Sequence, residues 1–207
     1  MQKNNIDIVR RLTGGKAVFH NKELTYSFIV PEKLNLLSKN INDSYYEIAQ
    51  ALAIALKKLG LNPEMRKVPE KILTPICFNS ANWYELTVNN KKISGSAQRR
   101  FDGKILQHGP ILLDFDYYKN SILFNSTNNL DNIENLKKRI TSLKQELNKE
   151  ISINAVKEAI KYGFQKYFNF DIVEDSLSKE EMELTEKLRK EKYSTDEWNY
   201  RLLTKIV

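Results

Sequence analysis

The sequence predicts an α+β protein, because strand-like and helix-like patterns occupy separate parts of the chain. Apolar and polar residues alternate in Leu24–Val30 and in Tyr84–Val88, which is typical of half-buried strands. In the last third of the chain, apolar residues recur three and four positions apart, which is typical of amphipathic helices. Most strands are therefore expected in the first two thirds of the chain.

Turn residues separate the predicted strands. Asn89-Asn90 supplies a two-residue hairpin turn, Gly103 divides a second strand pair, and Pro31 ends an earlier strand. The Asn89-Asn90 hairpin brings the start of its first strand near the residues that follow its second. We expect strands over residues 6–9, 17–20, 24–30, 84–88, 91–93 and 111–116, with a further pair around Gly103.

Four segments have helical patterns. A capping box at Ser44–Glu47 predicts a helix that begins near Ser44 and stops at Gly60, and a second one at Ser178–Glu181 opens a charged helix to about Lys192. Two apolar stripes lie between these helices, each predicting one more: Ile133, Leu136, Ile140, Leu143 and Leu147, then Val156, Ile160, Phe164 and Phe168. Residues 61–76, which include three prolines, and Asn125–Asn129 are expected to form loops.

Composition narrows the class of protein. The 207 residues are 41% hydrophobic and 29% charged, as expected of a soluble globular domain. No apolar run approaches membrane-spanning length and the first residues lack the apolar core of a signal peptide, so we expect a cytoplasmic protein. One cysteine cannot form an internal disulfide. His20 and His108 lie too far apart for metal-ligand spacing, so no metal is expected. The net charge of +7 favours an acidic partner; without a dense basic block, nucleic acid is not expected.

Cys77 is the lone cysteine, and Lys92 follows it fifteen residues later. Most lone cysteines are buried and behave as small apolar residues. The alternative is a nucleophile, because a nearby ammonium lowers the pKa of a thiol and the thiolate is the attacking species. The remaining motifs decide between these two interpretations.

Four segments in order carry a specific resemblance: Arg10–His20 with its Gly14-Gly15 pair, Cys77-Phe78 with Trp83-Tyr84-Glu85, Lys92–Gln98, and Leu106–Leu113. Together they resemble the lipoate–protein ligase and octanoyltransferase family, over nearly the whole chain. The resemblance implies a biotin/lipoate ligase-like fold, a mixed β-sheet flanked by helices with a short C-terminal helical segment. It also implies a catalytic domain over residues 1–175 and a helical tail over 176–207.

Within that family, the chain is most similar to the cysteine-dependent octanoyltransferases. ATP-dependent ligases typically have a third glycine where Lys16 stands, and they need no cysteine nucleophile. The similarity implies that Cys77 accepts an octanoyl group from octanoyl-acyl carrier protein as a thioester. The group then passes to a lysine of a lipoyl-accepting protein, such as a glycine-cleavage H protein. No cofactor is implied beyond the phosphopantetheine of the carrier, and no membrane is involved.

The resemblance also implies roles for individual residues. Lys92 would lower the pKa of Cys77, and these two residues are the expected catalytic pair. Glycines would leave room for the acyl chain. Arg11 and Lys16 would face phosphopantetheine or an acidic carrier, although ion pairs at a strand edge remain open for both. The expected substrate-binding residues are Arg11, Gly14, Gly15, Lys16, His20, Gly95, Ala97 and His108.

His20 and His108 keep two interpretations each. His20 is more typical of a structural hydrogen-bonding residue than of a general base. His108 either takes a proton from the incoming lysine or orders its loop.

Three alternatives stay open. One is an octanoyl or lipoyl amidotransferase, and a second is an ATP-dependent lipoate–protein ligase. Relatives usually carry an Arg-Phe-Tyr-x-Trp-type segment upstream of the double arginine, whereas here Met1 stands directly before the first predicted strand. A third alternative is therefore an incomplete binding subunit of a split enzyme, whose missing N-terminal segment another chain supplies.

Overall fold

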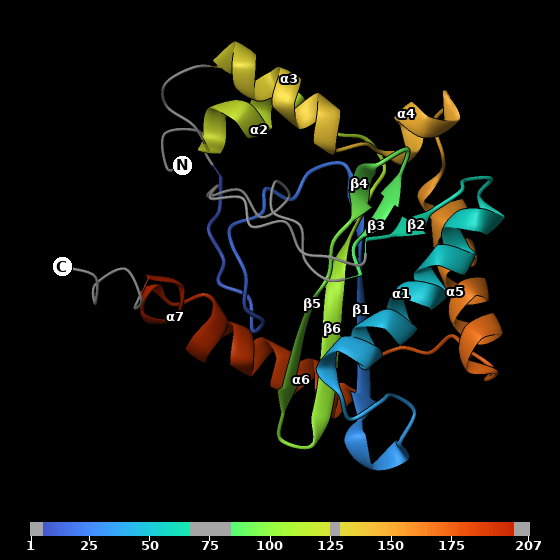
Figure 1. Ribbon diagram of the computed structural model, residues 1–207. Helices are drawn as coiled ribbons and strands as arrows, with labels where there is room; N and C mark the ends of the chain where they lie inside the picture. Colours follow the sequence, from blue (N-terminus) through green and yellow to red (C-terminus); the bar gives the residue numbers. More distant parts are fainter. Residues whose placement is uncertain (1–5, 67–83, 125–128, 201–207) are drawn as a thin grey trace. The chain divides into compact units, whose positions relative to one another are not determined.

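The computed structural model describes residues 6–66, 84–124 and 129–200 (Figure 1). It divides into two compact units. The larger unit spans Thr13–Ile172, and the smaller one combines the residues up to Leu12 with those from Val173 onward. No helix in the described part of the chain is long and apolar enough to cross a membrane.

A six-stranded sheet forms the centre of the larger unit and confirms the predicted α+β class. Its strands are β1 (Glu23–Pro31), β2 (Glu64–Met65), β3 (Leu86–Val88), β4 (Lys91–Ser94), β5 (Ala97–Phe101) and β6 (Lys104–Leu112). The order is β1-β6-β4-β3-β2, and β5 also pairs with β6. These strands pair antiparallel, and a parallel pairing occurs as an isolated bridge between Lys92 and Ile140.

Both predicted hairpin turns are present. Asn89 and Asn90 have φ of 50° and 62°, and Asp102 and Gly103 have φ of 51° and 65°. Two successive left-handed residues form the turn whose twist matches that of antiparallel strands, and asparagine, aspartate and glycine adopt it most readily. These local preferences explain why the sequence located both hairpins correctly.

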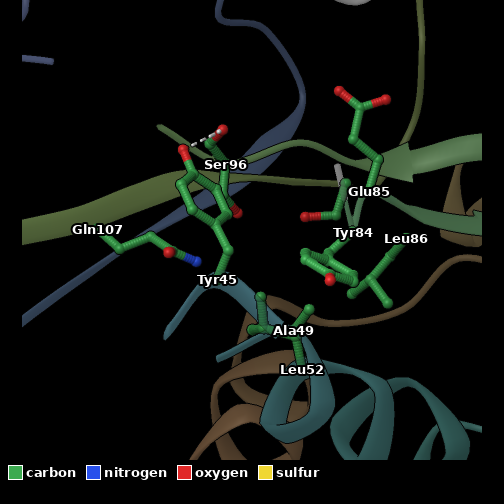
Figure 2. Close-up of a pocket in the computed structure, with 9 residues that line it drawn as sticks. Tyr45, Ala49, Leu52, Tyr84, Glu85, Leu86, Ser96 and Gln107 are labelled. Carbon is green, nitrogen blue, oxygen red and sulfur yellow. Dashed lines mark hydrogen bonds between the residues drawn. The ribbon is translucent and has the colours of Figure 1, made fainter. Parts of the chain in front are cut away.

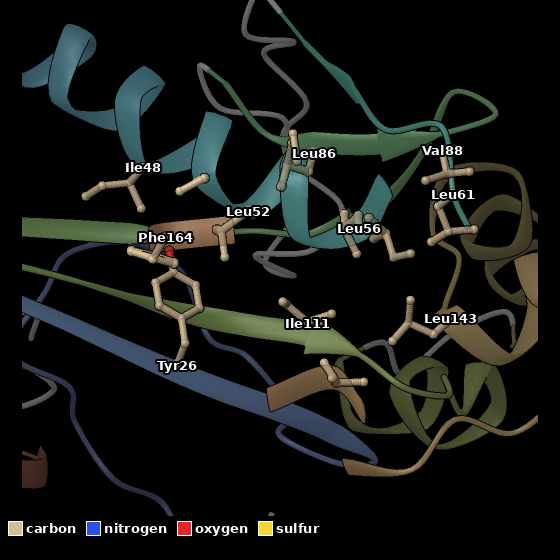
Figure 3. Packing of buried hydrophobic residues seen from close by; sticks show 14 of the residues in the cluster. Tyr26, Ile48, Leu52, Leu56, Leu61, Leu86, Val88, Ile111, Leu143 and Phe164 are labelled. Carbon is tan, nitrogen blue, oxygen red and sulfur yellow. The ribbon is translucent and has the colours of Figure 1, made fainter. Parts of the chain in front are cut away.

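Two long helices cover one face of the sheet, α1 (Ile41–Lys58) and α5 (Ile153–Phe168). Leu52 and Leu56 of α1 pack in one core cluster with Ile111 of the sheet and Phe164 of α5 (Figure 3). The predicted stripe on α5 is confirmed, since Val156 and Phe164 are buried. Among the described residues, this unit also contains the helices η2 (Glu32–Leu34), α2 (Tyr117–Phe124), α3 (Asn129–Arg139) and α4 (Leu143–Leu147).

The predicted start of α1 was wrong. The helix begins at Ile41 because the Asn40 side chain accepts hydrogen bonds from the backbone N–H groups of Asn42 and Asp43. Ser44 is instead fully buried within the helix, where its hydroxyl donates to Gln98 Oε1 of β5 at 3.0 Å. Ser44 with Glu47 three residues later fitted the capping-box pattern, but the Ser44 hydroxyl makes a tertiary hydrogen bond instead of capping the helix.

The single helix predicted through Ile133–Leu147 is also wrong. α3 ends at Arg139, and Ile140 turns to the sheet, where the Thr141 N–H donates to the Lys92 carbonyl at 2.9 Å. Ser142 then caps α4 by accepting from the Gln145 N–H. The apolar stripe continues across the break because Ile140 and Leu143 are both buried, although they belong to different elements.

Two predicted strands near the N-terminus do not form. Residues 6–9 have no strand structure, and 17–20 contain a single bridge residue, Ala17. The strand predicted over 111–116 is the end of β6, which stops at Leu112. Short alternating segments are weak signals because their pairing depends on a partner distant in sequence.

The smaller unit contains the C-terminal helices α6 (Lys179–Leu188), η4 (Arg189–Tyr193) and α7 (Asp196–Tyr200). The predicted capping box of α6 is confirmed, with Ser178 and Glu181 bonded reciprocally. Trp198 Nε1–H donates to the Arg10 carbonyl at 2.8 Å, and the Arg10 guanidinium lies 4.2 Å from the indole centroid. These contacts join the two ends of the described chain. The boundary at residue 175 stays a prediction.

Candidate active site

A buried ion pair lies at the centre of the candidate site. Lys92 of β4 and Glu85, one residue before β3, are each 6% exposed. The Lys92 ammonium donates to Glu85 Oε1, with 2.6 Å between nitrogen and oxygen. A charge that is removed from water is costly unless it is paired, so the contact between these two groups offsets part of the cost of burying them.

The local backbone conformation directs the side chains of Lys92 and Glu85 towards each other. β3 and β4 pair with a bulge, in which Leu86 lies opposite Ser94 and Thr87 opposite Lys92, so Ile93 is the extra residue. A bulge redirects neighbouring side chains and is frequent beside active sites. In the turn before β3, Tyr84 has a left-handed φ of 57° directly before Glu85.

Two glycines provide the space that the lysine needs. A Cβ on Gly95 would lie 2.6 Å from Lys92 Cε and 2.9 Å from its Nζ, so the lysine side chain occupies that position. A Cβ on Gly109 of β6 would lie 2.1 Å from the Gly95 carbonyl oxygen. Gly95 therefore accommodates Lys92, and Gly109 accommodates the Gly95-Ser96 backbone. The sequence predicted room for an acyl chain at Gly95, a role that stays a prediction.

A hydrogen-bond network fixes the turn between β4 and β5. Tyr26 of β1 shares a hydrogen bond with the Ser96 hydroxyl at 2.7 Å and accepts one from Gln107 Nε2 at 3.0 Å. Gln98 and Ser44 extend the network towards α1. Burial raises the pKa of Tyr26 to about 12, so its hydroxyl is protonated at neutral pH.

A small pocket adjoins the ion pair on the α1 side of the sheet (Figure 2). Its cavity volume is about 10 Å³, about the space that one water molecule needs. The Tyr45 hydroxyl donates to the Ser96 carbonyl at 3.3 Å at one wall, and Glu85 contributes a polar group at another. Its lining residues are Tyr45, Ala49, Leu52, Tyr84, Glu85, Leu86, Ser94, Ser96 and Gln107.

His108 and the glycine-rich loop meet on the opposite face of the sheet from α1 and α5. His108 lies between Ser27 of β1 and Ala97 of β5, and its Nε2 is 2.7 Å from Thr13 Oγ1. Gly14 and Gly15 follow Thr13 directly, so this hydrogen bond holds the start of their loop at His108.

The structure brings some of the predicted site residues together and leaves others apart. Lys92 and Gly95 are in contact, Ala97 pairs with His108, and Thr13 links His108 to the loop of Gly14, Gly15 and Lys16. Lys16 and both loop glycines are exposed.

The remaining predicted residues lie elsewhere. His20 is exposed and bonded to Glu23 through Nδ1 at 2.5 Å, which fits the structural interpretation. Arg11 belongs to the smaller unit. Cys77 and Trp83 lie outside the described residues, and so does most of the loop predicted over 61–76.

Sequence reasoning assigned no role to Glu85, Gly109, Thr13 or Tyr26. Glu85 and Gly109 stood inside quoted motifs, and Glu85 offered a usable signal, because a charged residue directly precedes the buried strand β3. The contacts of Tyr26 and Thr13 are 70 and 95 residues distant in sequence, and no local pattern reports them. In the described part of the chain, no group of three acidic, histidine or cysteine side chains could hold a metal ion.

Comparisons with known proteins identify the family of this chain. The family model of the lipoyl protein ligase A/B catalytic domain matches residues 1–165. Octanoyltransferase LipM of Clostridioides difficile (strain 630) is 39% identical over 94% of this chain and 74% of its own length. Octanoyltransferase LipM of Bacillus subtilis (strain 168) is 35% identical over 97% of this chain and 76% of its own length.

Solved structures show the same fold. A lipoate-protein ligase A bound with ATP superposes with a TM-score of 0.78 at 26% identity, over 96% of this chain and 74% of that one. The bi-partite lipoate protein ligase of Thermoplasma acidophilum, studied with its E2 lipoyl domain, gives a TM-score of 0.79 at 25% identity, over 96% and 72%.

Proposed function

Because this chain belongs to the family of the lipoyl protein ligase A/B catalytic domain, we propose that it is an octanoyltransferase of lipoate biosynthesis. The similarity to LipM octanoyltransferases over nearly all of this chain favours octanoyl transfer over ligation. The buried Lys92–Glu85 pair carries the chemical part of the proposal, since it holds a hydrogen-bond donor at a defined place beside the motif turn.

In the first half-reaction, the Cys77 thiolate attacks the carbonyl carbon of the octanoyl thioester on acyl carrier protein. The Lys92 ammonium stabilises the oxyanion that develops on the carbonyl oxygen. The bond between that carbon and the phosphopantetheine sulfur then breaks, and the carrier leaves as a thiolate that takes up a proton. The product is octanoyl-Cys77. Such a covalent intermediate divides a difficult transfer into two easier ones.

In the second half-reaction, the neutral ε-amine of a lysine on a lipoyl-accepting protein attacks octanoyl-Cys77. The carbon–sulfur bond breaks, Cys77 leaves as a thiolate, and the amine nitrogen loses a proton as the amide forms. His108 is the candidate proton acceptor, because Thr13 orients its ring in the sheet face below the glycine-rich loop.

The glycine-rich loop and the sheet face below it are the proposed acyl site. Gly14, Gly15 and Ala97 have little or no side chain, so methylenes of the acyl chain can pack close to their backbone. Burial contributes about 0.8 kcal/mol for each methylene, so an octanoyl chain supplies several kcal/mol. Lys16 is exposed in the same loop, and its ammonium is the proposed contact for the phosphate of phosphopantetheine.

Intact mass measurement after incubation with octanoyl-acyl carrier protein tests the proposal. The wild-type chain should gain one octanoyl group, and the adduct should be absent from Cys77→Ala and strongly reduced in Lys92→Ala. An adduct of equal yield in Cys77→Ala would contradict the nucleophile. Addition of a lipoyl-accepting protein should then move the octanoyl group to that protein.

Two other activities give different results in the same assay. The likeness to an ATP-bound lipoate-protein ligase favours ligation as the second candidate, which would require ATP and a free acid. An amidotransferase would accept octanoyl from an octanoylated protein instead of from the carrier. Tight carrier binding without any adduct would identify a binding subunit.

A further inference from the structure

We infer that Glu85 is a positioning residue that holds the Lys92 ammonium in its working orientation. This inference rests on the proposed octanoyl transfer, in which Lys92 faces the reacting carbonyl. It concerns a residue that would act through Lys92 and would not itself touch the substrate. The Glu85 carboxylate lies 2.6 Å from the ammonium, and both side chains are almost fully buried.

A lysine needs such a partner because its side chain is long and flexible. Its four-carbon stem has many rotamers, and its compact ammonium is strongly hydrated in water. Lys92 has lost that water, since its side chain is 7% exposed. The carboxylate of Glu85, whose side chain is 5% exposed, replaces part of the lost hydration and selects one direction for the N–H donors.

The second restraint on Lys92 is Gly95. The last carbon and the nitrogen of the lysine lie where a Cβ of residue 95 would stand. The ammonium is therefore bonded to the Glu85 carboxylate and packed against the Gly95 backbone. Little freedom remains for it to swing away from the turn formed by Gly95 and Ser96.

The backbone before Glu85 adopts a costly conformation that supports a positioning role. Tyr84 has a left-handed φ of 57°, which is unfavourable for a residue with a large side chain. Two backbone hydrogen bonds to Arg66 hold this conformation. The Tyr84 N–H donates to the Arg66 carbonyl at 2.9 Å, and the Arg66 N–H donates to the Glu85 carbonyl at 3.0 Å. The Tyr84 ring also packs edge-on against Tyr46, at 5.4 Å between centroids. Strained residues of this kind persist where they place a functional group.

Pairing also changes what Lys92 contributes to the reaction. The Glu85 carboxylate lies 2.6 Å from the ammonium and opposes its charge, so the main contribution of Lys92 is a directed N–H donor. We expect it to stabilise the oxyanion through a hydrogen bond of fixed geometry more than through a long-range field. A displacement of about 1 Å in such a group reduces turnover by about 100-fold.

The test compares Glu85→Gln with its conservative variant. Glu85→Gln keeps the side-chain shape and removes the charge, and it should lower kcat for octanoyl transfer by about 100-fold with KM within about threefold. Glu85→Asp keeps the charge and should restore part of the loss. The matched control is Glu64→Gln, an exposed glutamate on the neighbouring strand β2, which should transfer at the wild-type rate. Wild-type kcat in Glu85→Gln would overturn the inference.

A double-mutant cycle separates positioning from a direct role. In a Lys92→Met background, Glu85→Gln should change kcat by less than about threefold, because a residue that acts through Lys92 has nothing left to position. A second full loss in that background would show that Glu85 acts independently and would refute positioning. The double variant buries no charge, so it also keeps the test available if Glu85→Gln alone fails to fold.

Reductive methylation of Lys92, followed by peptide mass spectrometry, needs no enzymatic activity. Lys92 should be protected in the wild type and in Glu64→Gln but modified at least tenfold faster in Glu85→Gln of unchanged melting temperature. Equal protection in Glu85→Gln would overturn the inference. Failure of the wild type to form octanoyl-Cys77 would instead contradict the proposed function, while the methylation result would still decide whether Glu85 holds Lys92.

Discussion

At the scale of single residues, the environment of Lys92 explains why this lysine, and not its neighbour Lys91, is the candidate catalytic residue. Its neighbour Lys91 is half-buried at the hairpin end, whereas Lys92 is buried against Gly95 and bonded to Glu85. The two lysines are chemically identical, so only their surroundings distinguish a solvated strand residue from a candidate catalytic group. The same surroundings make the site sensitive to a single added methyl group.

Gly95→Ala tests that sensitivity. The new Cβ would lie 2.6 Å from Lys92 Cε, and the lysine must move because it is the more flexible of the two. We expect a loss of about 1–3 kcal/mol in the free energy of unfolding and a much larger effect on turnover, about 100-fold. Urea unfolding and octanoyl-transfer kinetics measure the two effects.

Gly14→Ala is the matched control for stability. A Cβ at Gly14 meets no atom within 4 Å, so the free energy of unfolding should stay within about 0.5 kcal/mol of the wild type. If Gly14→Ala destabilised the protein as much as Gly95→Ala, the close contact with Lys92 would not be the cause.

Tyr26 gives a prediction with a defined pH dependence. Burial raises its pKa from 10.0 to about 12, although hydrogen bonds to Ser96 and Gln107 lower it in part. The unfolded chain therefore ionises Tyr26 first, and the stability that this residue contributes below pH 10 is lost as the pH rises from about 10 to about 12. The full difference corresponds to about 3 kcal/mol.

Urea unfolding of Tyr26→Phe at pH 8 and pH 11 checks this sign. At pH 8 the variant should be about 1–3 kcal/mol less stable, because Gln107 loses a buried partner. At pH 11 the gap should shrink by about 1 kcal/mol. Tyr118→Phe, at a residue that is 62% exposed, should show no gap at either pH. A gap for Tyr26→Phe that is constant with pH would be inconsistent with the raised pKa.

At the scale of elements, the contact between α1 and α5 depends on Gly163. A Cβ at this position would lie 2.2 Å from the Ala51 carbonyl oxygen and 2.9 Å from the Ala55 nitrogen, both backbone atoms of α1. The two helices therefore approach more closely than any side chain at residue 163 would permit. Because α1 and α5 together cover the core, their separation affects the whole larger unit.

Gly163→Ala should therefore destabilise the protein even though alanine favours helix. The propensity gain is about 1 kcal/mol, whereas forcing two helix backbones apart costs about 3 kcal/mol, the upper end of the usual range, because both close contacts are with backbone atoms. We expect a net loss of about 2 kcal/mol in the free energy of unfolding and a lower melting temperature. Glu158→Ala, on the exposed side of α5, should leave stability nearly unchanged. A stabilised Gly163→Ala variant would refute the close packing.

The elements also show where sequence patterns succeed and fail. The helix over 153–168 and the turn at Asn89-Asn90 were predicted correctly, because periodicity and turn chemistry act within a few residues. The break after Arg139 was missed because Ile140 leaves the helix to pair with Lys92, a residue 48 positions earlier. Ser44 was misread for the same reason, since its partner Gln98 lies on a strand.

At the scale of the whole molecule, the net charge of +7 affects the rate at which the chain associates with charged partner proteins. Opposite net charges speed encounter more than they strengthen the final complex. We expect the proposed carrier and acceptor proteins to be acidic, so association should weaken as salt screens the attraction.

The salt dependence of octanoyl transfer tests this expectation. Raising ionic strength from about 0.01 M to about 1 M shortens the screening length tenfold, so kcat/KM for octanoyl-acyl carrier protein should fall. Formation of octanoyl-Cys77 from a small uncharged octanoyl thioester should change little over the same range. An equal fall with both donors would indicate an effect of salt on the enzyme itself.

By itself, the sequence determined the family, the α+β class, both hairpin turns and the importance of Lys92 as a candidate, because motif order, periodicity and turn residues are local properties. Only the tertiary structure decided what surrounds Lys92. Glu85 lies seven residues earlier, directly before β3, and a bulge at Ile93 together with the left-handed Tyr84 sets the direction of each side chain. Lys92 becomes buried and paired with Glu85 only when separate segments of the chain pack together, and local sequence patterns do not predict that packing.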